Sequence, residues 1–168
     1  MMTKDLFSRA RVRKLLWYVL YLFLTLVAQN MVLTNLRLAG ICPFILPAAA
    51  VAVGMFEGSG RGAIFGLVMG IFADFAFIES TVGFTLMFPL LGFGAGFIAQ
   101  FFINRRFLAY MLAAAGGLLT VALLQMLRVT VAEGFALEML GTVVLQTVWS
   151  LPMAAVLYFP PERLSEYD

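Results

Sequence analysis

The chain has 168 residues, of which 63% are apolar and 12% are charged, and its formal net charge is +2. A soluble domain of this size could not hide so much apolar surface, so the composition predicts a protein that lives in a lipid bilayer. Spans of about 20 residues leave only short loops and no room for a soluble catalytic domain. The lack of histidine and the single cysteine, Cys42, make a metal site, a catalytic triad or an internal disulfide unexpected.

The first expected element is a membrane helix preceded by a basic segment, residues 1–14. That segment is expected to lie in the cytoplasm, where it can also bind anionic lipid headgroups. The apolar run that follows, residues 15–36, is too long for the core of a signal peptide and has no small-residue cleavage pattern. Because the apolar residues are continuous, instead of alternating, the run predicts a retained helix and not a barrel strand.

The second apolar run, residues 41–56, is short for a membrane span. Pro43 and Pro47 lie near its start, where a helix tolerates proline, so it predicts a thin, tilted or partly re-entrant helix. Four longer runs predict four further helices, at residues 62–78, 82–103, 107–131 and 139–159. The last helix is expected to stop at Pro160-Pro161, which leaves residues 160–168 as a cytoplasmic tail.

The distribution of basic residues predicts the orientation. With the amino terminus inside, the cytoplasmic side holds Lys4, Arg9, Arg11, Arg13, Lys14, Arg61, Arg105, Arg106 and Arg163. Only Arg37 falls clearly outside, and the reverse orientation would break the positive-inside rule. We therefore expect an all-α, polytopic membrane protein with six transmembrane helices over residues 15–159 and both termini in the cytoplasm. This topology explains the basic residues, so nucleic-acid binding is not expected.

Glycines recur every four residues in the predicted helix at 62–78. Together with an acidic residue in the same register they form one helix stripe: Gly62, Gly66, Gly70 and Asp74. A neighbouring helix can approach such a stripe closely. In the next helix, Gly92 and Gly96 form a similar segment. Helix packing inside the chain explains both sets, and contact with a partner protein or a small ligand is the alternative.

Asp74 is the most informative charged residue of the predicted spans. An ionised carboxylate near the bilayer centre costs at least about 2.5 kcal/mol, so Asp74 is expected to face inward and to have a partner. Arg128 lies in the same half of the predicted bilayer, which makes a buried Asp74–Arg128 ion pair possible. Alternatively, Arg128 extends to the interface and Asp74 accepts hydrogen bonds from nearby hydroxyl or backbone groups. A proton relay is disfavoured, because no second buried carboxylate or histidine continues it.

Residues 47–106 contain several motifs that together point to a family. They are Glu57-Gly58, Arg61-Gly62-Ala63-Ile64-Phe65-Gly66-Leu67, Gly70-Ile71-Phe72-Ala73-Asp74, Gly83 and Leu91-Gly92-Phe93. This region resembles the central part of the bacterial rod-shape-determining protein MreD family. The chain length, the short loops and Arg105-Arg106 also fit that family.

The resemblance implies a non-enzymatic integral membrane subunit of the cell-elongation complex in the bacterial plasma membrane. Such a subunit organises peptidoglycan synthesis and cell shape through protein–protein contacts. Its implied partners are a bitopic protein of the MreC type and, indirectly, the MreB filament and the wall-synthesis polymerase and transpeptidase. No cofactor, metal ion or catalytic residue is implied.

The glycine-rich hairpin is also similar to the substrate-binding S-components of energy-coupling-factor transporters, which share a six-helix plan. Vitamin binding is therefore the alternative function. The outer loops are short and, apart from Phe135 and its acidic neighbours, contain few polar or aromatic groups that could close over a vitamin. This feature favours the scaffold over the transporter.

Overall fold

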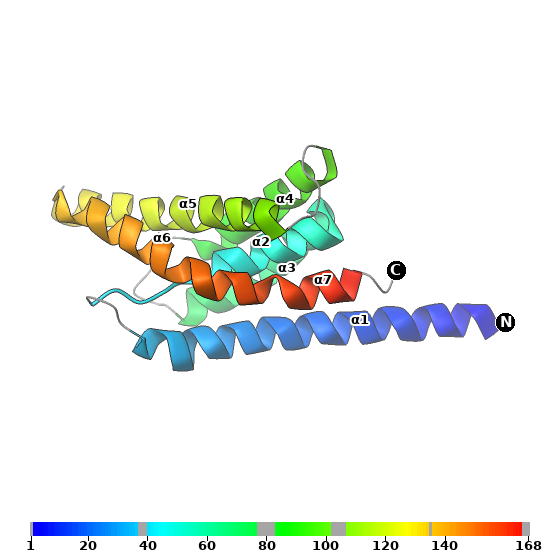
Figure 1. Cartoon of the computed structure of the whole chain (residues 1–168). Helices are drawn as coiled ribbons and strands as arrows, with labels where there is room; N and C mark the ends of the chain where they lie inside the picture. The colour runs from blue at the N-terminus through cyan, green and yellow to red at the C-terminus, as the bar shows by residue number, and fades with distance from the viewer. Residues whose placement is uncertain (1, 37–39, 77–82, 102–106, 135, 166–168) are drawn as a thin grey trace.

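The computed structural model describes residues 2–36, 40–76, 83–101, 107–134 and 136–165 (Figure 1). Within these ranges the chain forms helices and connecting turns, without a strand. The helices are α1 (Met2–Val27), α2 (Leu46–Glu57), α3 (Ser59–Ala76), α4 (Phe84–Phe101), α5 (Phe107–Glu133), α6 (Glu138–Leu157) and α7 (Phe159–Ser165). Arg37, Arg105 and Arg106, which enter the orientation argument, and Phe135 lie outside the described residues.

Four helical segments of the described part are long and apolar enough to cross a membrane. They are Val12–Asn35, Ser59–Ala76, Phe107–Ala132 and Glu138–Leu164. Two further apolar helices, Leu46–Glu57 and Phe84–Gln100, are shorter. Each of the six predicted apolar runs thus contains a helix, but two of the helices are shorter than a typical span.

Helix α1 begins at Met2, well before the predicted start at residue 15. The basic segment is therefore part of the helix, because it contains good helix formers and neither glycine nor proline. The far end of α1 changes to a π-helical turn, Ala28–Val32, and then to a 3₁₀ turn, Leu33–Asn35. The predicted end near residue 36 is close to the last of these turns.

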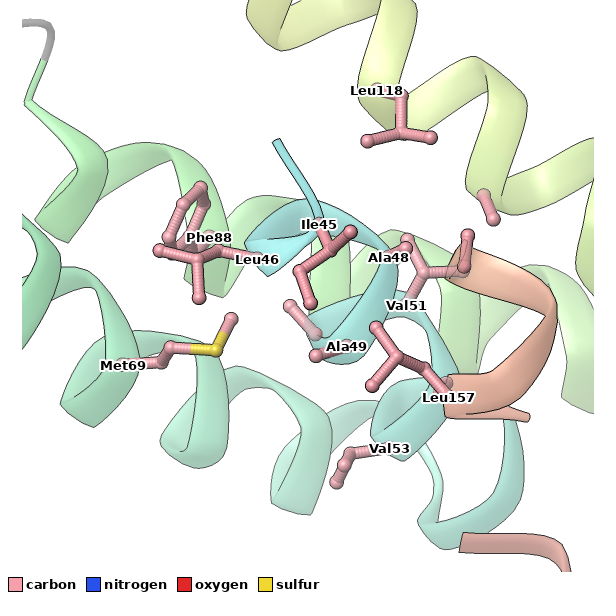
Figure 2. Packing of buried hydrophobic residues seen from close by; sticks show 14 of the residues in the cluster. Ile45, Leu46, Ala48, Ala49, Val51, Val53, Met69, Phe88, Leu118 and Leu157 are labelled. Carbon is pink, nitrogen blue, oxygen red and sulfur yellow. The ribbon is translucent and has the colours of Figure 1, made fainter. Parts of the chain in front are cut away.

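Helix α2 is the centre of the fold. All of its residues from Leu46 to Phe56 are buried, and it packs against α3 and α4 on one side and against α5 on the other. Figure 2 shows Leu46 and Ala49 of α2 among Met69 of α3, Phe88 of α4 and Leu118 of α5. The small side chains of α2 let these helices approach closely, which explains why so short a helix can organise the bundle.

The predicted stop at Pro160-Pro161 is wrong. Helix α6 ends at Leu157, and the chain continues directly into α7, where both prolines occupy the first turn. Proline is tolerated at that position because the first N–H groups of a helix have no partner within the helix. The break itself lies at Tyr158, whose N–H donates to the carbonyl of Ala155 at 3.4 Å. Most of the predicted tail is therefore helical.

Candidate functional site

The glycine stripe of α3 packs directly against the backbone of α4. A Cβ atom on Gly66 would overlap the carbonyl group of Phe88. A Cβ atom on Gly70 would overlap the carbonyl group of Phe84 in the same way. Helix backbones approach this closely only where side chains are absent. The stripe therefore joins two helices of the same chain.

Three helices meet at one glycine junction, formed by Gly54 of α2, Gly62 of α3 and Gly92 of α4. A Cβ atom on any of these glycines would overlap backbone atoms of another. Gly96 continues the contact, because its Cβ atom would overlap the backbone of Ser59 at the start of α3. Gly54 is a member that sequence spacing does not find, since it stands alone in its helix instead of in a four-residue repeat.

Asp74 caps the amino terminus of α4. Its Oδ1 accepts a hydrogen bond from the N–H of Phe84 at 2.9 Å. Its Oδ2 accepts two from Thr85, from the N–H at 2.9 Å and from the hydroxyl at 2.6 Å. A carboxylate is favoured there because the first N–H groups of a helix lack partners and the helix dipole attracts negative charge. Of the two arrangements considered for Asp74, the structure has the hydrogen-bonded one.

The predicted Asp74–Arg128 ion pair is not formed. Both carboxylate oxygens of Asp74 are directed to α4, and Arg128 is exposed on α5. The physical reason is proximity along the chain, because the first turn of α4 follows Asp74 by about ten residues and supplies N–H donors. The carboxylate therefore needs no cation from a distant helix.

A second carboxylate, Glu57, ties α1 to the turn between α2 and α3. Its side chain is only 3% exposed, and it forms salt bridges with Lys14 at 2.9 Å and with Arg61 at 2.6 Å. The hydroxyl of Tyr18 donates a further hydrogen bond at 2.8 Å. Burial acts to raise the pKa of the Glu57 carboxyl, but the hydrogen bonds from Lys14, Tyr18 and Arg61 outweigh burial and lower the pKa. Glu57 lies outside the four candidate spans, and its partners on α1 are not evident from the sequence.

Side chains from the π-helical turn after α1 and from α6 satisfy the backbone that leads into α2. Gln29, which lies in the π-helical turn and is 2% exposed, donates to the carbonyl of Pro43 at 3.0 Å. The same side chain accepts a hydrogen bond from the N–H of Ile45 at 2.9 Å. Ser150 of α6 accepts one from the N–H of Phe44 at 2.9 Å. A buried non-helical segment needs such partners, and the helix that follows it is short, with 12 residues.

Two tyrosines complete the break between α6 and α7. Pro161 has no N–H to donate to the carbonyl of Leu157, which accepts a hydrogen bond from the hydroxyl of Tyr21 at 3.1 Å. The carbonyl of Ala154 is left open by the same break and accepts one from the hydroxyl of Tyr110 at 2.8 Å. Tyr21 and Tyr110 come from α1 and α5, so the break is held from two sides.

No family model, curated protein or solved structure matches the chain. Within the described part, no group of three or more histidine, cysteine, aspartate and glutamate residues could hold a metal ion. The polar side chains of Asp74, Glu57 and Gln29 are hydrogen-bonded within the chain. This arrangement holds helices at fixed spacings and angles.

Proposed function

We propose that this chain is a non-enzymatic membrane scaffold of the bacterial cell-elongation complex, in the role that its resemblance to the MreD family implies. One observation carries the proposal: the residues of the MreD-like motif serve helix packing. Gly66 and Gly92 allow α3 and α4 to touch, and Asp74 joins the ends of these helices. Because these interior residues contact other helices of the same chain, we expect the chain to contact other molecules through its outer surface, as a scaffold does.

The proposal includes six crossings of the membrane. Apolar side chains cover the outside of the bundle, for example Phe75 at 75% and Leu108 at 72% exposed. Such a surface is stable when lipid or a partner covers it. Helix α4 has 18 residues and a length of about 27 Å, close to the thickness of the hydrocarbon core. Helix α2 is shorter, but the hydrogen-bonded residues before it, 43–45, extend it towards a full crossing.

Charge supports an orientation with both termini in the cytoplasm. The start of α1 and the end of α7 lie at the same end of the bundle (Figure 1). Lys14 and Arg61 meet at the turn between α2 and α3, and Arg163 is near the end of α7. The positive-inside rule assigns the end with these basic residues to the cytoplasm.

A pull-down tests the proposed function. The tagged full-length chain is purified from its native membrane in mild detergent, with an unrelated multi-pass protein of similar size as the control. We expect an MreC-type bitopic protein and other elongation proteins, identified by mass spectrometry, to be enriched over the control. Depletion of the chain should also round rod-shaped cells. Recovery of paired ATPases with a membrane coupling subunit would overturn the proposal and favour the vitamin-transporter alternative.

The topology has its own test in a Cys42→Ser background, which removes the single native cysteine. Gly60→Cys lies at the start of α3, and Ala136→Cys lies between α5 and α6; both positions are exposed. On intact cells, a membrane-impermeant maleimide should label Ala136→Cys and leave Gly60→Cys unlabelled until the cells are opened. Labelling of Gly60→Cys alone on intact cells would reverse the orientation.

A further inference from the structure

The first long helix touches the rest of the chain along one narrow stripe. Between residues 12 and 36 the buried residues are one per helical turn: Tyr21, Thr25, Gln29 and Leu33. A helix that packs firmly on a core buries a wider face, at positions i, i+3, i+4 and i+7. The apolar window of Val12–Asn35 is 17% buried, against 33%, 33% and 22% in the other three candidate spans. Helix α1, at one edge of the bundle in Figure 1, thus belongs to the least embedded of these spans.

Helices α2, α3 and α4, in contrast, are locked together. They meet backbone to backbone at the glycine junction, where no Cβ atom fits. Helix α1 contains no glycine and contacts α3 through aromatic rings. The ring centroids of Tyr18 and Tyr21 lie 6.4 Å and 5.9 Å from that of Phe65. Because side chains separate these two helices, α1 can move without disturbing the glycine junction.

The far half of this segment, residues 21–33, is anchored to the bundle. Gln29 of the π-helical turn binds the carbonyl of Pro43 and the N–H of Ile45. The hydroxyl of Tyr21 donates to the carbonyl of Leu157. A short stretch of π-helix or 3₁₀-helix within a longer helix often marks a hinge or a functional site. The far half therefore provides a pivot near Gln29.

The near end, residues 12–20, is held by polar contacts. No side chain in this stretch is buried. Lys14 forms its salt bridge with Glu57 at 2.9 Å, and the hydroxyl of Tyr18 donates to the same carboxylate at 2.8 Å. The Glu57 side chain is 3% exposed, and charge-assisted hydrogen bonds are strong where water is excluded. These two contacts of Glu57, with Lys14 and with Tyr18, form the latch.

Glu57 keeps a cation when the latch opens. Arg61 of α3 binds the other carboxylate oxygen at 2.6 Å. This second ion pair lies within the turn between α2 and α3 and does not involve α1. A buried carboxylate that loses its last partner is strongly destabilising. Because Arg61 remains, the near end of α1 can leave without that penalty.

We propose that α1 is a strap, which pivots near Gln29 and is held shut by the latch on Glu57. When the latch opens, the near end tilts away from α3 and uncovers Phe65, which is 8% exposed under the closed strap. The helix rises about 26 Å from Gln29 to Val12, so a tilt of about 20°, common for membrane helices, moves Val12 by about 9 Å. This movement goes beyond the proposed function and does not depend on which partner the chain binds.

Distances between spin labels test the strap by double electron–electron resonance. The full chain is reconstituted in lipid nanodiscs and carries Cys42→Ser, which removes the single native cysteine. The α1–α3 pair, Val12→Cys with Ile64→Cys, reports the position of the near end. The α3–α5 pair, Ile64→Cys with Leu108→Cys, reports the bundle itself. These three residues are 53%, 66% and 72% exposed, so the labels do not disturb the core.

The Lys14→Gln/Tyr18→Phe variant opens the latch and leaves Glu57 paired with Arg61. We expect the α1–α3 distance to lengthen by up to about 9 Å and its distribution to broaden, while the α3–α5 distance stays native. Arg61→Gln is the matched control, because it removes a cation from the same carboxylate but keeps both contacts with α1. It should leave the α1–α3 distance native.

Three results would overturn the strap. A native α1–α3 distance in Lys14→Gln/Tyr18→Phe would mean that packing alone holds α1. Longer distances for both label pairs would mean that the latch supports the whole bundle instead of one helix. An equally long α1–α3 distance in Arg61→Gln would mean that the charge balance at Glu57, and not its contact with α1, sets the position of the helix.

Discussion

Asp74 of α3 holds Thr85 of α4 through two hydrogen bonds, one to the backbone N–H and one to the hydroxyl. Asp74→Ala should therefore lower the free energy of unfolding by about 1–3 kcal/mol, because the first turn of α4 loses its cap. Asp74→Asn keeps an acceptor oxygen and should lose less. Thermal unfolding of the purified chain in detergent measures these changes. A loss with Asp74→Asn as large as that with Asp74→Ala would contradict a role that depends on hydrogen bonding.

Arg128 provides the control for this prediction. Because the hydrogen bonds of Asp74 go to α4, the effects of Asp74→Ala and Arg128→Ala should add in the double variant. Partial rescue of Asp74→Ala by Arg128→Ala would instead indicate that the two charges interact.

The packing of α3 against α4 predicts that Gly66→Ala is destabilising. A Cβ atom there would overlap the carbonyl group of Phe88, so the helices must separate at a cost of about 1–3 kcal/mol. Gly116→Ala on α5 is the matched control, because a Cβ atom there has no neighbour within 4 Å. Gly116→Ala should be neutral or stabilising by up to about 1 kcal/mol, as expected for alanine in a helix. Thermal unfolding of both variants makes the comparison, and equal melting temperatures would contradict the packing.

The apolar runs predict the helices well because each run is long and continuous, so a helix is the natural state of its backbone. The places where helices break are less predictable. The start of α2 depends on Gln29 and Ser150, and the break after α6 depends on Tyr21. These partners come from helices distant in sequence, so local propensity does not indicate them.

The candidate site, too, is only partly predictable from the sequence. The four-residue spacing of Gly66 and Gly70 identifies a close-packing face, because the helical repeat puts both on one side. That spacing does not say which helix fills the face. The contact of Gly54 with Gly92 and the ion pair of Glu57 with Lys14 involve helices that are distant in sequence, so the spacing of residues does not predict them.

The break between α6 and α7 predicts a coupling between Tyr21 and Pro161. Tyr21→Phe removes the hydroxyl that the carbonyl of Leu157 binds, and an unsatisfied buried carbonyl costs about 1–3 kcal/mol. Pro161→Ala restores an N–H four residues after Leu157, which can replace the lost donor. Tyr21→Phe should therefore cost less in the Pro161→Ala background, as measured by a double-mutant cycle in thermal unfolding. Strict additivity would show that the two groups do not compete for this carbonyl.

The Glu57 cluster predicts a loss of stability in acid. The pKa of the Glu57 carboxyl is lowered in the folded chain by Lys14, Tyr18 and Arg61, despite the opposing effect of burial. A lowered pKa means that this carboxyl stabilises the fold above its unfolded-state pKa, and that the stabilisation is lost as the pH falls through its folded-state pKa. Glu57→Gln should be less stable than the native chain at neutral pH, because Lys14 and Arg61 lose their anion. Melting temperatures recorded from about pH 7 to about pH 3 should therefore converge for the two proteins as the carboxyl is protonated. A constant difference across that range would show that the charge of Glu57 does not contribute to stability.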